Sequence, residues 1–213
     1  MRRAILPASL AALAAAAAAP SADSPISIDA RPRVVPSVLS PGFDGVTVLG
    51  SLASGEANET ITIQANECSF PGWRDVASTQ TEPGGVWHTK IAPQTRTTYR
   101  ARWKTAVSAG VVVRTRPGVT LTRNGRTRWD VGVLAQRSFL DRRGRLERFD
   151  RRTRRWRLLK TFRLTEKDSV PAGSWTYAHF RARVRRGTQV RAVIPRAAVK
   201  PCYLAGFSLI LTT

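Results

Sequence analysis

The feature that most constrains the fold is an internal repeat with a constant spacing. Residues 63–73, "IQANECSFPGW", align with residues 146–156, "LERFDRRTRRW", at an offset of 83 positions. Upstream, residues 46–48 align with residues 129–131 at the same offset, so the preceding segment needs no gap. A chain that resembles itself over such a period is built from two copies of one structural unit.

Downstream, the spacing between the two copies changes. The segment "TTYRARW" (residues 97–103) resembles "TQVRAVI" (residues 188–194) at an offset of 91. The second copy therefore contains about eight extra residues in this part of the alignment. We expect the insertion around "EKDSVPAGS", residues 166–174.

The repeat also decides between two interpretations of the most basic segment. Residues 145–160, "RLERFDRRTRRWRLLK", suit either a basic amphipathic helix or two strands around a turn. The aligned part of the first copy contains Pro71-Gly72, a pair that a continuous helix does not tolerate. The sequence therefore predicts a β-hairpin over residues 145–161, with its turn at residues 151–154.

In this predicted hairpin, the arginines lie in the turn and on the solvated face. Trp73 and Trp156 align in the repeat and are expected to face the core at equivalent positions. Each copy also offers about seven short segments with strand character, separated by turn signals. Short strands at this spacing predict an all-β fold of two tandem β-sandwiches, over residues 33–116 and 117–213.

The beginning of the chain has the pattern of a secretory signal peptide. Arg2 and Arg3 precede an alanine-rich apolar stretch and then small residues, which predicts a signal peptide over residues 1–22. An uncleaved anchor helix is the alternative, but the stretch is short and poor in large apolar residues. Residues 23–32 are proline-containing and suggest a spacer. We expect a secreted, extracellular or cell-envelope-associated protein without a membrane span in its mature chain.

The strand pattern resembles a known class of modules. "GVTVLGSLASGE" and "TTYRARW", in which Tyr99 enters the penultimate strand, are similar to the Ig-like and fibronectin type III-like domains of secreted bacterial proteins. The resemblance implies a structural or adhesive module that binds an extracellular protein or a glycan. It also implies a tyrosine corner at Tyr99, which Val190 replaces in the second copy. Function inferred from such a fold is analogy.

The net charge of +21 is concentrated in the second copy. Residues 33–115 contain 8 Lys/Arg and 6 Asp/Glu, whereas residues 116–213 contain 24 and 6. This asymmetry supports an alternative function, in which the second domain binds an anionic wall polymer, an acidic polysaccharide or a nucleic acid. An extracellular location disfavours a dedicated nucleic-acid role. The candidate polyanion-binding residues are Arg143, Arg151, Arg152, Arg154 and Arg155.

Motifs for catalysis or for metal binding are not found. The two histidines, His88 and His179, stand singly in strand-like segments. The sequence has no zinc or calcium spacing, no nucleophile elbow, no phosphate-binding glycine loop and no dinucleotide fingerprint. We therefore assign no catalytic, cofactor-binding or metal-binding residues, and we do not expect an enzyme.

The two cysteines are predicted to form a disulfide bond. Cys68 and Cys202 are the only cysteines of a chain with an export signal, and the alternative is one unpaired thiol in each domain. In tandem Ig-like sandwiches the chain enters at one end and leaves at the other, which brings both cysteines to the junction. Their repeat counterparts are Arg151 and Val111 at offsets of 83 and 91, so neither position requires a cysteine within its own domain.

Overall fold

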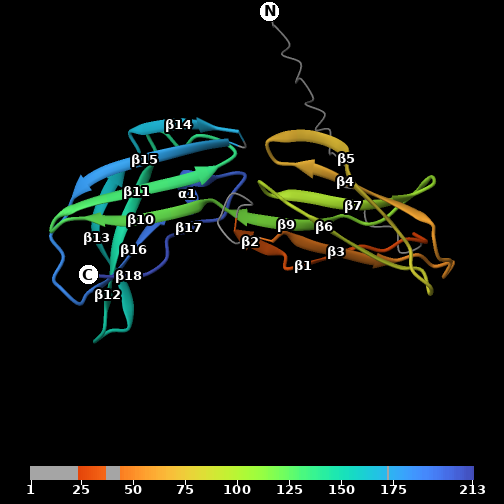
Figure 1. Ribbon diagram of the computed structural model, residues 1–213, viewed down its shortest axis with the longest axis horizontal. Helices are drawn as coiled ribbons and strands as arrows, with labels where there is room; N and C mark the ends of the chain where they lie inside the picture. Colours follow the sequence, from red (N-terminus) through yellow and green to blue (C-terminus); the bar gives the residue numbers. More distant parts are fainter. Residues whose placement is uncertain (1–23, 37–43, 172) are drawn as a thin grey trace, which may run out of the picture.

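The chain folds into two β-sandwiches that lie end to end (Figure 1). The computed structural model describes residues 24–36, 44–171 and 173–213. Within this part the regular structure is almost entirely β-strand, and the only helix, α1 (Arg196–Val199), is a single turn. The predicted all-β fold of two sandwiches is confirmed. The predicted signal peptide lies outside the described residues.

The first sandwich contains a smaller and a larger sheet. Its strands are β1 (Asp29–Arg31), β2 (Val34–Pro36), β3 (Val46–Ser51), β4 (Thr60–Glu67), β5 (Phe70–Gln80), β6 (Val86–Ile91), β7 (Thr97–Trp103), β8 (Ala106–Val107) and β9 (Val111–Arg116). The smaller sheet has the order β1-β3-β6, and the larger has the order β2-β9-β7-β4-β5, with β8 paired to β7. The short strand β2 runs parallel to β9, which closes this edge of the larger sheet.

Residues 24–32 belong to the first sandwich, so the predicted spacer over residues 23–32 is wrong for the described residues. Strand β1 pairs with β3, and the side chains of Ile26 and Ala30 are almost completely buried. Ile26, Ile28 and Ala30 alternate along the chain with the period of a strand. The neighbouring prolines flank this segment without interrupting its pairing, as an edge strand allows.

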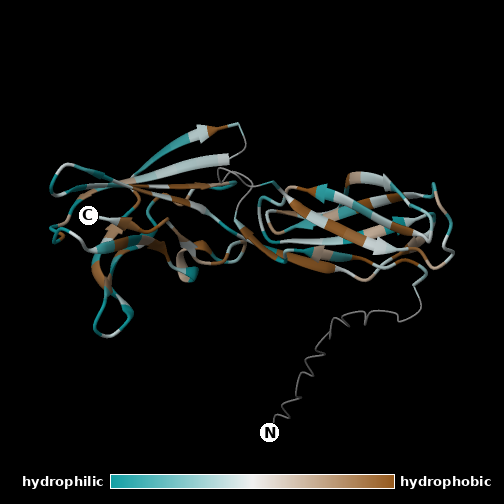
Figure 2. Cartoon of the chain, turned by 60° about the horizontal axis from the view of Figure 1, so that its bottom comes forward, coloured by the Kyte–Doolittle hydropathy of each residue, from teal (hydrophilic) through white to brown (hydrophobic). Residues whose placement is uncertain are grey.

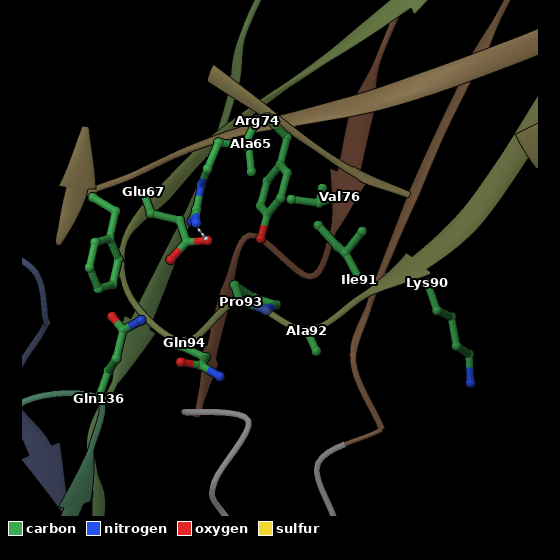
Figure 3. Close-up of a pocket in the computed structure, with 12 residues that line it drawn as sticks. Ala65, Glu67, Arg74, Val76, Lys90, Ile91, Ala92, Pro93, Gln94 and Gln136 are labelled. Atoms are coloured by element: carbon green, nitrogen blue, oxygen red, sulfur yellow. Dashed lines mark hydrogen bonds and ion pairs between the residues drawn. The ribbon is translucent and has the colours of Figure 1, made fainter. Parts of the chain in front are cut away.

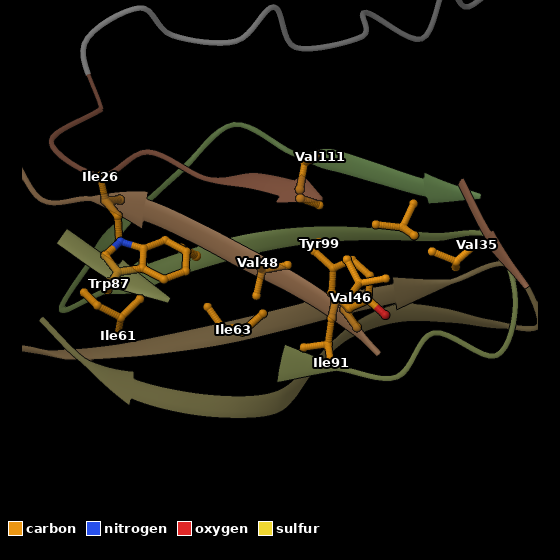
Figure 4. Close-up of a cluster of buried hydrophobic side chains, with 14 of the residues drawn as sticks. Ile26, Val35, Val46, Val48, Ile61, Ile63, Trp87, Ile91, Tyr99 and Val111 are labelled. Carbon is orange, nitrogen blue, oxygen red and sulfur yellow. The ribbon is translucent and has the colours of Figure 1, made fainter. Parts of the chain in front are cut away.

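The core of the first sandwich is built from alternate residues of facing strands (Figure 4). Val46 and Val48 of β3 and Ile63 of β4 are fully buried. The Trp87 ring of β6 is 1% exposed and lies against Gly50, where an added Cβ would come within 2.4 Å of the ring. A glycine is therefore required at this point of β3 for the tryptophan to enter the core.

The second sandwich has the same plan, but its smaller sheet has four strands where that of the first sandwich has three. Its strands are β10 (Gly118–Asn124), β11 (Arg128–Ala135), β12 (Arg143–Asp150), β13 (Arg155–Arg163), β14 (Glu166–Val170), β15 (Gly173–Arg181), β16 (Gln189–Ile194), β17 (Gly206–Phe207) and β18 (Leu211–Thr212). One sheet has the order β10-β11-β15-β14, and the other has the order β13-β12-β16-β17, with β18 also paired to β16. Figure 2 shows hydrophobic stretches along the strands and hydrophilic loops at the ends.

The basic segment forms the predicted β-hairpin. Strands β12 and β13 pair antiparallel, and residues 151–154 make the turn between them. The hairpin projects from the second sandwich (Figure 1). A β-bulge between Leu146 and Glu147 shifts the register of this pair, and a bulge between Ile63 and Gln64 occurs at the aligned position of the first copy. The repeat thus preserves an irregularity of the backbone as well as the strands.

Two insertions account for most of the difference in spacing between the copies. Strand β14 lies within the segment where extra residues were expected and adds an edge strand to its sheet. The second insertion precedes the last strand. Leu211 pairs with Val190 in the second copy as Val111 pairs with Tyr99 in the first, so Leu211 is the counterpart of Val111 and the offset between the copies is 100 there. The proposed alignment of Cys202 with Val111 is therefore wrong. Cys202 lies in an inserted segment, residues 195–205, which we call the junction loop.

The junction loop belongs to the second sandwich and is bonded to the first. The sulfur atoms of Cys68 and Cys202 lie at bonding distance and their Cα atoms are 5.4 Å apart, which confirms the predicted pairing. Beside the disulfide, the Arg96 amide donates to the Cys202 carbonyl at 2.9 Å, and the Leu204 amide donates to the Thr115 carbonyl at 2.9 Å. A covalent bond and main-chain hydrogen bonds therefore act together where the chain passes from Arg116 to Gly118.

Candidate functional site

The arginines singled out from the sequence do not form one group. Arg151, Arg152, Arg154 and Arg155 lie at the tip of the β12–β13 hairpin, whereas Arg143 begins β12 and pairs with Arg163 at the opposite end of the hairpin. All five are exposed. The strands of the hairpin separate Arg143 from the tip, because a strand advances about 3.3 Å per residue.

The hairpin tip is held in one conformation by Asp150. Its Oδ1 accepts hydrogen bonds from the backbone amides of Arg152 at 3.0 Å and Thr153 at 3.3 Å. Hydrogen bonding from Thr153, together with the Arg152 amide and the nearby Arg157 guanidinium, lowers the pKa of the Asp150 carboxyl. The carboxylate therefore stabilises the turn and pairs with Arg157. The side chains of Arg151, Arg152 and Arg154 project from this hydrogen-bonded turn.

A second basic loop lies beside this tip. Residues 182–188 connect β15 to β16, and β16 pairs with β12, which brings this loop close to Arg151. Arg151, Arg185 and Arg186 line a shallow cavity of about 370 Å³ together with Phe149. The sequence alone could not join these residues, because their proximity results from the pairing of two strands that are distant in the chain.

A third basic loop completes the cluster. Arg123 and Arg126 lie at the turn between β10 and β11 and line a cavity of about 620 Å³ with Arg183 and Arg186. The Ala182 amide donates to the Thr127 carbonyl at 2.8 Å, which fastens this turn to the β15–β16 loop. Because Arg186 borders both cavities, the basic surface is continuous. We call it the basic end; it consists of Arg123, Arg126, Arg151, Arg183, Arg185 and Arg186.

The side chains that line the two cavities of the basic end include arginines but, in the described part of the chain, no acidic residues. Arg123 is oriented by backbone carbonyls, since its guanidinium donates to Gly125 and Arg126 at 3.0 Å each. The loop that contains Arg185 is held by the Thr213 hydroxyl, which donates to the Arg185 carbonyl at 2.7 Å. The guanidiniums are thus held on ordered loops and are open to an external anion.

The side chains of this surface are suited to contact with anions. A guanidinium has five N–H donors, no acceptor and a permanent charge, and it matches carboxylate, sulfate or phosphate oxygens in a bidentate geometry. Such groups stabilise bound anions but provide no general base. The candidates chosen from the hairpin omit the other arginines of the basic end. These arginines lie in two arginine-rich segments of the sequence, "RNGRTR" (residues 123–128) and "RARVRR" (residues 181–186).

The predicted core positions of Trp73 and Trp156 are wrong. Trp73 is 37% exposed, and Trp156 is only partly buried. The Arg100 guanidinium lies 4.0 Å from the centre of the Trp73 ring, and the Arg191 guanidinium lies 4.3 Å from that of Trp156. The repeated β-bulge explains the difference, because the extra residue, Val76 in β5 and Leu159 in β13, places the side chains on its other side, the tryptophans among them, on the opposite face.

These stacked pairs are a repeated element of the outer sheet surface. Arg100 donates to Gln64 at 2.8 Å, and Arg191 donates from two nitrogens to Glu147 at 3.0 and 2.8 Å. Each arginine is therefore held by a partner at the bulge and by a tryptophan. In the second sandwich the Phe149 ring lies 5.4 Å from Trp156, so the aromatic surface extends to the edge of the basic end.

A further cavity opens at the end of the first sandwich next to the junction (Figure 3). It has a volume of about 450 Å³ and includes Gln136 of the second sandwich. Its charged groups are paired: Arg74 binds Glu67 at 2.7 Å, and Lys90 binds Asp44 at 2.7 Å. Tyr99 lines the cavity, and burial raises the pKa of its hydroxyl. Among the described residues no backbone group accepts a hydrogen bond from this hydroxyl, so the tyrosine corner implied by the resemblance is not formed.

The two histidines have acidic neighbours. His88 Nδ1 lies 3.4 Å from Glu82, and His179 Nδ1 lies 2.7 Å from Asp130. The hydrogen bond to Asp130 is the main reason why the pKa of His179 is raised. The described residues contain no group of three or more His, Cys, Asp or Glu side chains that could hold a metal ion.

Comparison with protein-family models and curated proteins gives no relative from which a function could be transferred. No protein-family model matches the chain, and no curated protein matches it in sequence. Across the residues described by the structure, no helix has the length and apolar character needed to cross a bilayer.

Proposed function

We propose that this protein is a non-catalytic, secreted or cell-surface-associated binding module, and that its second domain binds linear anionic polymers through the basic end. The observation that carries this proposal is the convergence of six arginines from three loops without an acidic residue lining the cavities between them. An anion that spans both cavities contacts several guanidiniums at once and releases the small counterions bound to it.

The resemblance to Ig-like and fibronectin type III-like modules supports the non-catalytic part of the proposal. Such modules serve as spacers, adhesive domains or binders of proteins and glycans, and the two end-to-end sandwiches suit that role. The cross-domain disulfide supports export, because such bonds persist in oxidising compartments. In this account the first sandwich and the junction loop hold the basic end at a fixed orientation.

A specific ligand class follows from the geometry. The two cavities lie side by side along the end of the domain, which suits repeated anionic groups on a chain better than one isolated ion. Phe149 at the margin of one cavity offers an apolar contact for a sugar ring. We therefore propose an acidic polysaccharide as the polymer, with carboxylate or sulfate groups that bind the arginines.

The test is retention of the full-length mature protein on a dextran sulfate matrix. The variant R183Q/R185Q/R186Q should elute at a clearly lower salt concentration than the wild type, because it removes three guanidiniums of the basic end. The control R142Q/R143Q/R145Q removes the same charge at exposed positions away from this surface. Equal elution of the two variants would show that only net charge matters, and retention on neutral dextran would argue against an electrostatic site.

A further inference from the structure

A second cluster of cations lies at the junction of the two sandwiches, far from the basic end. It borders a crevice of about 360 Å³ whose walls come from both domains. Arg96 and Arg114 belong to the first sandwich, and Arg196 and Lys200 belong to the junction loop. We call this the junction crevice. It is separate from the site of the proposed function.

The four cations of the junction crevice lack acidic partners in the described chain. None of them lies within ion-pair distance of a carboxylate there, whereas Arg74 and Arg191 each form an ion pair with a glutamate. The one polar side-chain contact in this group is that of Arg96, whose guanidinium is 3.9 Å from the Cys68 sulfur. Like charges from two domains thus face one opening, an arrangement that destabilises the junction unless an anion offsets it.

Backbone hydrogen bonds join the two walls of the crevice. The Arg96 amide is bonded to the Cys202 carbonyl and the Thr115 carbonyl accepts from Leu204, both at 2.9 Å. Thr115 also lines the crevice; its side chain is fully buried, and its hydroxyl has no hydrogen-bond partner among the described residues.

We propose that the junction crevice binds a tetrahedral oxyanion, phosphate or sulfate, that bridges the two domains. Such an ion carries up to two negative charges and presents oxygens in several directions, so it can contact guanidiniums from opposite walls simultaneously. A single carboxylate has two oxygens and one charge, and it leaves most of the four cations uncompensated. Binding of the ion couples the sandwiches and stabilises the folded, docked arrangement.

The proposal is tested by isothermal titration of the wild-type protein with inorganic phosphate, at constant ionic strength maintained with sodium chloride. The expected result is saturable binding, accompanied by a rise in Tm that chloride does not reproduce. The variant R114Q/R196Q removes one guanidinium from each wall and should weaken phosphate binding at least about tenfold. Circular dichroism of this variant verifies that both sandwiches remain folded.

The matched control is R123Q/R126Q, which removes the same charge from the basic end. It should bind phosphate like the wild type, whereas R183Q/R185Q/R186Q should bind dextran sulfate more weakly and keep phosphate binding. Failure of one site is thus distinguishable from failure of the other. A parallel titration with polyphosphate distinguishes whether the anion that binds in the crevice is a free ion or a phosphate group of a polymer. Equal phosphate affinity of R114Q/R196Q and the wild type, or no saturable binding at all, would overturn the proposal.

Discussion

At the scale of single residues, the outer tryptophans show how an arginine can stabilise a sheet surface. The Arg191 guanidinium lies 4.3 Å from the centre of the Trp156 ring and 5.0 Å from that of the Phe207 ring, and it donates a hydrogen bond to the Glu147 carboxylate. A cation placed over an aromatic face contributes about 0.5–2 kcal/mol, depending on how far it is removed from water. The same pairing of Arg100 with Trp73 indicates a structural role for this contact in both domains.

The substitution Trp156→Ala should therefore lower the free energy of unfolding by about 1–2 kcal/mol, since it removes a stacking contact and part of a half-buried ring. The control is Trp129→Ala, which removes a fully buried ring and should cost about 3–5 kcal/mol. Urea unfolding followed by circular dichroism measures both changes. If the two substitutions cost the same, Trp156 belongs to the core after all.

His179 gives a residue-scale prediction for pH. Its hydrogen bond to Asp130, with smaller charge effects of Asp130 and Glu166, raises the pKa of His179 above the usual value of 6.5. The folded state therefore favours the protonated form. The resulting contribution to stability is fully present below about pH 6.5 and is lost as the pH rises through the raised pKa.

The measurement is an NMR titration of the His179 ring in the wild type and in Asp130→Asn. The wild-type midpoint should lie above 6.5, and the substitution should return it toward that value. An unchanged His179 midpoint in the variant would show that Asp130 does not interact with the ring in solution.

At the scale of elements, the hairpin was predictable because of the internal repeat. The periodicity of residues 145–160 alone suits a helix as well as a hairpin. Pro71-Gly72 excluded a helix for the aligned arginine-rich segment, and β12 and β13 confirm this. The β-bulges could not be predicted, since nothing in the residues around Val76 or Leu159 shows that β5 and β13 each gain one unpaired residue there. That single irregularity explains why the orientation of both tryptophans was predicted incorrectly.

The junction loop shows a second limit at this scale. The disulfide was predicted from the number of cysteines and the order of strands, but the proposed alignment of Cys202 with Val111 missed the insertion that contains it. Within this loop Tyr203 is 3% exposed, and its hydroxyl accepts a hydrogen bond from the Gln136 amide at 3.0 Å. The Cys68 side chain also packs against the core of the second sandwich.

The double substitution Cys68→Ser/Cys202→Ser should destabilise the protein and loosen the junction. The bond closes a loop across a sequence separation of 134, for which the chain-entropy account gives at most about 4–5 kcal/mol. Small-angle X-ray scattering should show a wider range of domain orientations than in the wild type, while the circular dichroism spectrum stays that of folded sandwiches. Two free thiols in unreduced mature wild-type protein, detected by mass spectrometry, would contradict the assigned bond.

At the scale of the whole molecule, the sequence predicted the charge asymmetry but not its geometry. The 24 Lys/Arg of residues 116–213 could have covered the domain evenly. Instead, strand pairing gathers Arg123, Arg151 and Arg183 at one end, beyond the last core layer. Of the five arginines selected from the sequence, only Arg151 lines the cavities there. All five were chosen from one continuous segment, whereas the cavities are lined by three segments that are distant in the chain.

The central claim, that the basic end binds an anionic polymer, is tested most directly by the salt dependence of the binding constant for dextran sulfate. Each arginine that contacts the polymer releases counterions and contributes about one unit to the slope of log K against log salt concentration. The variant R183Q/R185Q/R186Q should reduce this slope by about three units, and R142Q/R143Q/R145Q should leave it nearly unchanged. An equal slope in all three proteins, or an equal reduction in both variants, would contradict a localised site at the basic end.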